Sequence, residues 1–137
     1  MLSGYSKTPL GRKLGIKRGF KVLLHNAPKH YCELFEDWPE EVVILNKTGS
    51  GKIDFIHLFC TEMEVLEKIL PEYQVALKKN GLIWISWPKG ASKIETDLNR
   101  DIIRSYVLKT TGLVDVKVAA IDQDWSGLKF VYRLENR

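Results

Sequence analysis

Cysteine, proline and long apolar runs are scarce in this 137-residue sequence. Its two cysteines, Cys32 and Cys60, are far apart and lie among apolar residues, which excludes a disulfide scaffold and predicts that both are reduced and buried. No apolar run approaches the roughly 18 residues of a membrane span. Lys7 and Pro9 interrupt the stretch where a secretory signal would lie. We therefore expect a cytoplasmic protein with no membrane partner.

Acidic residues are absent from the first 32 positions, which carry seven lysines and arginines. The remaining positions carry 14 basic and 17 acidic residues, so a segment of charge +7 precedes a body of charge −3. With 45% hydrophobic residues, the chain can form one core without disulfides or metals. The sequence predicts a single domain over residues 1–137, in which residues 1–19 form a basic N-terminal segment with a short helix.

Local signals divide the chain into alternating strands and helices. Thr8 as N-cap, Pro9 at the first helical position and Gly15 as a left-handed stop predict the short helix. Thr61 to Glu64 is a capping-box pattern before a long helix that Pro71 should kink or split. The patterns predict strands at 20–25, 42–45, 53–59, 82–87, 114–120 and 128–134, with helices at 28–38, at 61–80 and from a cap at Thr96 or Asp97 to Gly112.

Strands that alternate with helices favour a parallel sheet covered on both faces. The last two predicted strands instead alternate apolar and polar residues, and the short connection 122–126 should make them an antiparallel pair. The sequence therefore predicts an α/β fold of three layers, with a Rossmann-like, mostly parallel sheet of about six strands and an antiparallel C-terminal hairpin.

Two segments and the final hairpin follow the pattern of a known fold; the segments are Leu14-Gly-Ile-Lys-Arg-Gly-Phe-Lys-Val-Leu-Leu24 and Leu77-Lys-Lys-Asn-Gly-Leu-Ile-Trp-Ile-Ser86. The chain resembles the class I S-adenosylmethionine-dependent methyltransferase fold over most of residues 14–134. The resemblance implies a glycine-rich loop after the first strand, whose backbone amides cradle the cofactor, and an acidic residue after the second strand, which holds the ribose.

The chain departs from that pattern at all three expected cofactor contacts. The loop reads Asn26-Ala27-Pro28-Lys29-His30, with no glycine and with one amide donor lost at Pro28. Asn46 stands at the acidic position, and only six residues separate it from Ile53. The sequence therefore predicts a methyltransferase-like fold with one strand and its flanking helices deleted. S-adenosylmethionine is possible as a cofactor but disfavoured.

A second likeness covers the whole chain. The sequence is similar to a small bacterial family of unknown function, and this likeness implies no activity. The matching segments are Ser3-Gly-Tyr-Ser-x-Thr-Pro-Leu10, Asn26-Ala-Pro28, His57-Leu-Phe59, Ser86-Trp-Pro-Lys89, Thr96-Asp-Leu98, Val114-Asp-Val-Lys-Val118 and Trp125-Ser-Gly-Leu-Lys129.

Ligands of open α/β sheets bind outside the carboxyl ends of the strands. Asn26 could donate hydrogen bonds there, Trp87 could stack on a ring, and Lys89 could meet an anion, although Asn26 could equally cap a helix at Pro28 and Trp87 could pack in the core. The candidate ligand-binding residues are Asn26, Lys29, Thr61, Ser86, Trp87 and Lys89.

Other motifs favour structural roles. The three histidines lack metal-ligand spacing, so no metal site is expected. Residues 47–52 lack the first glycine of a phosphate loop and precede a strand, which indicates a connector. Ser126 lies in the predicted hairpin turn, with neither a base nor an oxyanion hole indicated by the spacing.

Basic residues near the N-terminus could track a phosphate backbone, or they could form a solvated face balanced by the acidic body. Trp125 could anchor a protein partner. The candidate partner-binding residues are Arg12, Lys13, Lys17, Arg18 and Trp125. Three functions follow: a non-catalytic domain that binds a small anionic ligand or a macromolecule, a methyltransferase with an altered cofactor site, or a nucleic-acid-associated protein.

Overall fold

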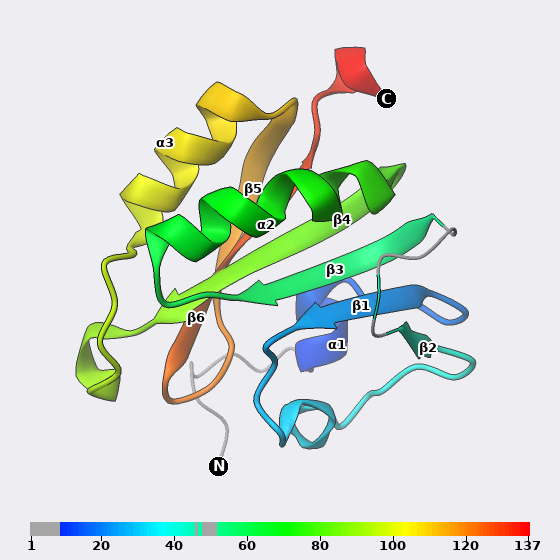
Figure 1. The fold of residues 1–137 in the computed structure, drawn as a ribbon. Helices are drawn as coiled ribbons and strands as arrows, with labels where there is room; N and C mark the ends of the chain where they lie inside the picture. Colours follow the sequence, from blue (N-terminus) through cyan, green and yellow to red (C-terminus); the bar gives the residue numbers. More distant parts are fainter. Residues whose placement is uncertain (1–8, 46, 48–51) are drawn as a thin grey trace.

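A mixed β-sheet forms the centre of the protein (Figure 1). The structure is a computed structural model that describes residues 9–45, 47 and 52–137. Within them the strand order is β2-β1-β3-β4-β6-β5. The four strands β2, β1, β3 and β4 pair in parallel, and β5 and β6 form the antiparallel C-terminal pair, as predicted. β6 also pairs antiparallel with β4. The strands are β1 (Lys21–His25), β2 (Val43–Leu45), β3 (Ile53–Phe59), β4 (Leu77–Pro88), β5 (Leu113–Ala120) and β6 (Trp125–Tyr132).

Helices α2 (Met63–Ala76) and α3 (Arg100–Thr110) cover one face of the sheet, in front of it in Figure 1. Leu66 and Leu70 of α2 and Ile103 of α3 are fully buried against apolar side chains of β3 and β4. The apolar burial of these helical faces supplies most of the packing energy on this side. None of the helices in the described part of the chain has the length and apolar character that crossing a bilayer requires.

The opposite face is covered by shorter pieces: helix α1 (Leu10–Leu14) and an irregular segment with one 3-10 turn, η1 (Tyr31–Leu34). The helix predicted for residues 28–38 is therefore wrong. Tyr31 and Phe35 are still buried, and Phe35 contacts the Trp38 ring edge-to-face, so packing uses the apolar spacing without a helix. Trp84 of β4 anchors α1 through an Nε1 hydrogen bond of 2.8 Å to the Leu14 carbonyl.

Helix α1 takes its N-terminal cap from a residue far along the chain. The Asp37 carboxylate accepts from the backbone amides of Gly11 at 2.9 Å and Arg12 at 3.0 Å. A Cβ on Gly11 would lie 2.7 Å from the Asp37 carboxylate, so glycine is required for this approach. Pro9 is the N-cap rather than the first helical residue, whereas Gly15 ends the helix at φ +92°, as predicted. The predicted cap Thr8 lies outside the described residues.

Replacing Asp37 with alanine should lower the free energy of unfolding by about 1 kcal/mol, because two amides of α1 lose their acceptor. Urea denaturation measures the change. Glu36→Ala is the matched control, since Glu36 is an exposed neighbouring carboxylate with no hydrogen bond among the described residues. Equal losses in the two variants would contradict the assignment of Asp37 as the cap.

The other helix boundaries also depend on distant residues. α2 ends at Ala76 rather than at Gly81, because Leu77 already pairs with Ile53 in the sheet. Pro71 lies inside this helix and does not split it. A Cβ on Gly81 would lie 2.9 Å from the Asp54 carbonyl oxygen, so this glycine permits close strand approach rather than a helix stop. β6 begins at Trp125, three residues before the prediction.

The predicted N-caps of α2 and α3 are wrong. Glu62, not Thr61, is the N-cap of α2 and makes no side-chain cap bond. Asp97 accepts from the Met63 amide at 2.8 Å instead. α3 is capped by Asn99, whose side chain accepts from the Ile102 amide at 2.9 Å.

Both cysteines are free thiols. Cys60 is buried as predicted, and burial raises the pKa of its thiol to about 12. Cys32 is exposed, which corrects the prediction, because the short η1 turn leaves its side chain outside the core.

Candidate functional site

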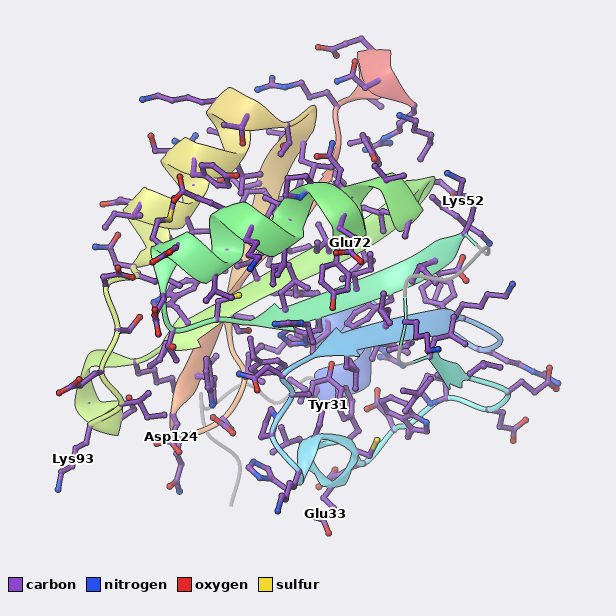
Figure 2. All side chains as sticks on the ribbon, viewed as in Figure 1. Tyr31, Glu33, Lys52, Glu72, Lys93 and Asp124 are labelled. Atoms are coloured by element: carbon purple, nitrogen blue, oxygen red, sulfur yellow. The ribbon has the colours of Figure 1, made fainter. Side chains whose placement is uncertain are left out.

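The carboxyl ends of β1, β3 and β4 lie at one edge of the sheet, where an open cleft of about 780 Å³ begins at the end of β3. Of the six predicted ligand residues, Thr61 and Lys89 line this cleft. The loop between β4 and α3 forms its outer wall, and Figure 2 shows Lys93 extending from that loop toward solvent. The lining residues are Thr61, Glu62, Lys89, Gly90, Ile94, Glu95, Thr96 and Asp97.

The cleft is more acidic than the sequence suggested. Three exposed carboxylates, those of Glu62, Glu95 and Asp97, line it together with the single cation of Lys89. An anion bound there would meet more negative than positive charge. Within the cleft, Lys89 is therefore outnumbered by carboxylates.

Asn26 lies at the end of β1 with its backbone at φ +55°, in the left-handed region that glycine adopts most easily and asparagine tolerates. Its side-chain amide donates to the Phe59 carbonyl at 3.4 Å and so ties the end of β1 to the end of β3. It does not cap a helix at Pro28, since no helix begins there. Lys29 follows on the exposed surface.

Ser86 and Trp87 lie in the core rather than at the cleft. Trp87 is only 9% exposed and packs beneath α2 and α3, whereas Ser86 is fully buried on the opposite face. Ser86 Oγ lies 2.7 Å from His57 Nε2, and His57 Nδ1 lies 2.9 Å from Tyr31 Oη. Figure 2 places Tyr31 between η1 and the sheet. These three side chains form a buried triad that sequence reasoning missed.

The buried triad is electrically neutral. Burial lowers the pKa of His57 to about 3 and raises the pKa of Tyr31 well above 10. A neutral imidazole donates from one ring nitrogen and accepts at the other, so each hydroxyl can complete one hydrogen bond with it. The signal available in the sequence was a histidine and a serine, each flanked by apolar residues, in two predicted strands.

His25 and His30 have separate partners. His25 Nδ1 lies 2.9 Å from Tyr73 Oη of α2, on the face opposite His57, and burial lowers the pKa of His25. His30 Nε2 lies 3.1 Å from Asp122. In the part of the chain that the structure describes, no three metal-ligating side chains converge.

The contact between His30 and Asp122 fastens the loop after β1 to the turn between β5 and β6. Asp122 is 8% exposed, and its other oxygen accepts from the amides of Asp124 and Trp125 at 2.8 and 2.9 Å. The half-buried Trp125 ring meets Phe59 edge-to-face at 5.1 Å. The chain's own side chains therefore close this part of the strand ends.

Known structures share this arrangement of strands and helices. A putative type 11 methyltransferase from Sulfolobus solfataricus superposes with a TM-score of 0.60 at 16% identity, over 90% of this chain and 89% of that one. The ribosomal protein L11 methylase of Lactobacillus delbrueckii subsp. bulgaricus gives 0.59 at 12% identity, covering 90% and 75%, and a SAM-dependent methyltransferase of Aquifex aeolicus gives 0.58 at 14%, covering 88% and 86%. The fold is that of the class I S-adenosylmethionine-dependent methyltransferases. No family model and no curated protein matches the sequence.

The methyltransferase-like fold raises the question of whether the residues present fit its cofactor. The backbone of Asn26 has the conformation of a cradle glycine, but its side-chain amide is bonded to Phe59. Pro28 offers no amide, and His30 is held by Asp122. The loop after β1 does not fit the cofactor in the way the glycine-rich cradle of the fold would. Asn46, at the predicted ribose position, lies outside the described residues.

The four basic residues among the predicted partner-binding residues divide into two sets. Arg12, Lys17 and Arg18 are exposed, and Arg18 is paired with Glu41 at 2.7 Å. Lys13 is half-buried, and its Nζ donates to the Ala120 carbonyl of β5 at 3.2 Å. The basic N-terminal segment thus contacts the C-terminal hairpin through Lys13. The hairpin carries lysines of its own.

Proposed function

We propose that this chain is a non-catalytic, methyltransferase-like domain of the cytoplasm that recognises an anionic partner. The observation that carries the proposal is the loop after β1, which lacks glycine. Its Asn26 and His30 side chains already contact the Phe59 carbonyl and the Asp122 carboxylate. A cofactor site of the usual kind presents backbone amides at this place, and Pro28 supplies none. The two free thiols are consistent with a reducing compartment.

The anionic partner is inferred from charge. Lysines of α1, β5 and β6 lie close enough together to influence one another's protonation. Lys89, at the edge of the cleft, belongs to the same group and connects the strand ends with it. A small anion near Asn26 and Lys89 would use one end of this positive region, and a macromolecule would use its whole length.

Calorimetric titration with S-adenosylmethionine tests the non-catalytic assignment. We expect no saturable heat with ligand at up to about 1 mM, since micromolar binding requires about 8 kcal/mol of favourable interaction that this loop does not offer. Saturable micromolar binding that Asn26→Ala weakens, and that the surface control Lys109→Ala leaves unchanged, would overturn it.

A second candidate function is methyl transfer with an altered cofactor site. It is favoured by the left-handed backbone of Asn26 and by Thr61 and Lys89 in the neighbouring cleft. This function requires transfer of a labelled methyl group to some acceptor, together with the cofactor binding described above. If neither methyl transfer nor cofactor binding is detected, the non-catalytic assignment is retained.

A further inference from the structure

Five lysines from four parts of the chain form a row on the face that α1 covers. Lys117 of β5 stands directly opposite Lys129 of β6, which in turn pairs with Trp84 of β4. The Lys117 Nζ donates to the Lys13 carbonyl at 3.1 Å. At one end of the row the charge of Lys17 lowers the pKa of Lys129, and at the other end the charge of Lys89 lowers the pKa of Lys13. The lysine row is Lys17, Lys129, Lys117, Lys13 and Lys89.

Four members of the row, Lys17, Lys129, Lys117 and Lys13, concentrate positive charge, whereas Lys89 also lines the cleft that holds three carboxylates. Burial, and then the neighbouring lysines, lower the pKa of both Lys13 and Lys129. Like charges directly opposite each other in a sheet are destabilising. None of the five is an ion-pair partner of a described carboxylate. Such an arrangement stores repulsion that a bound anion relieves.

The length of the row indicates a polyanion. Lys129 stands opposite Trp84 of β4, and Lys89, the first residue after this strand, lies five positions beyond Trp84, about 17 Å along an extended backbone. A Cβ on Gly15 would lie 3.5 Å from Lys129 Nζ, which places the turn that carries Lys17 close to Lys129. One strand of a nucleic-acid duplex advances about 3.4 Å per phosphate, so the row matches several consecutive phosphates rather than one.

The surroundings of the row disfavour a membrane or an added β-strand. The large apolar side chains that are exposed in the described part of the chain include no aromatic residue, and aromatic anchors are what membrane interfaces use. The outer edge of β5 carries an irregularity between Asp115 and Lys117, and a bulge with a lysine discourages strand addition. The lack of exposed aromatics also disfavours recognition by base stacking.

We propose that the lysine row binds the phosphate backbone of a nucleic acid without sequence preference. This inference rests on the anionic partner of the proposed function and names its class. The bases are not read, because none of the aromatic side chains in the described part of the chain is fully exposed and the row presents only ammonium groups. Duplex and single-stranded ligands of equal charge density should therefore bind alike.

Fluorescence anisotropy with labelled 20-base-pair DNA and RNA duplexes of arbitrary sequence tests the row. With about five phosphate contacts, the affinity of the full chain should fall about 500-fold between 50 and 200 mM salt. The double variant Lys117→Gln/Lys129→Gln should reduce the magnitude of the logarithmic salt slope by about 2 and weaken binding at least tenfold at low salt. Removing the opposed charges should leave the protein folded, which circular dichroism checks.

The matched control is Lys68→Gln/Lys109→Gln, which removes two exposed lysines from α2 and α3 on the other face. Duplex affinity of this control should equal that of the unchanged protein. The inference is overturned if the Lys117/Lys129 variant binds duplex as well as the control does, or if the protein binds vesicles of anionic phospholipid but no nucleic acid. Binding to vesicles alone would still support the proposal of an anionic partner. Saturable S-adenosylmethionine binding would instead overturn the non-catalytic assignment alone.

Discussion

Replacing His57 with leucine should lower the free energy of unfolding by about 2 to 6 kcal/mol, because two hydroxyls lose their only partner in the core. Tyr31 Oη and Ser86 Oγ lie 2.9 and 2.7 Å from the His57 ring, and all three side chains are buried. Each hydroxyl left without a partner costs about 1 to 3 kcal/mol in desolvation. Urea denaturation with a tryptophan fluorescence readout measures the loss.

The triple variant Tyr31→Phe/His57→Leu/Ser86→Ala separates polar pairing from packing. It leaves no unpaired hydroxyl, so most of the stability lost in His57→Leu should return. Tyr31→Phe alone should cost about 1 to 3 kcal/mol, since it leaves His57 Nδ1 without its partner. If the triple variant were as unstable as His57→Leu, the loss would come from cavity formation around the ring rather than from the hydrogen bonds.

Acid should destabilise the protein through the same histidine. The pKa of His57 is about 3 in the folded chain, whereas an unfolded histidine has its ordinary value of 6.5. Between these values the unfolded chain binds a proton that the folded chain excludes, so stability falls as the pH falls. From pH 7.5 to pH 5 this single group should remove about 2 kcal/mol.

The acid effect is measured as a difference between two proteins. Urea midpoints from pH 7.5 to pH 5 are compared for the unchanged protein and for the triple variant, which lacks His57 but keeps every other titratable group except the buried Tyr31. His25, whose pKa burial also lowers, contributes equally to both. The unchanged protein should lose about 2 kcal/mol more than the variant over this range. Parallel pH profiles would show that His57 is accessible to protons in the folded state.

The succession of strands along the chain and the antiparallel C-terminal pair could be predicted because they depend on local patterns. Alternation of apolar residues in β5 and β6, the nearly continuous apolar run over residues 82–87 of β4 and the Gly15 stop are each readable within a few positions. The helix predicted at 28–38 failed because Tyr31 and Phe35 satisfy the same spacing in an irregular segment. Leu77 left the predicted helix because Ile53, a residue 24 positions earlier, pairs with it in the sheet.

The candidate sites were less predictable because they join residues far apart in the chain. Lys13 and Lys17 could be selected from the acid-free N-terminal segment. Lys117 and Lys129 could not, because only the antiparallel register shows that they stand opposite each other. Asp37 and Asp97 resemble ordinary surface acids until the structure shows which amides they cap. A single sequence contains no signal for such partnerships.

The docking of α1 bears on how the chain reaches its native state. The contacts of Lys13 with Ala120 and of Lys117 with the Lys13 carbonyl join positions 107 and 104 residues apart. During synthesis, α1 leaves the ribosome long before the hairpin that receives it, and closing so large a loop slows folding. We expect the nascent chain to keep the Trp84 side of its sheet open until translation has passed β6.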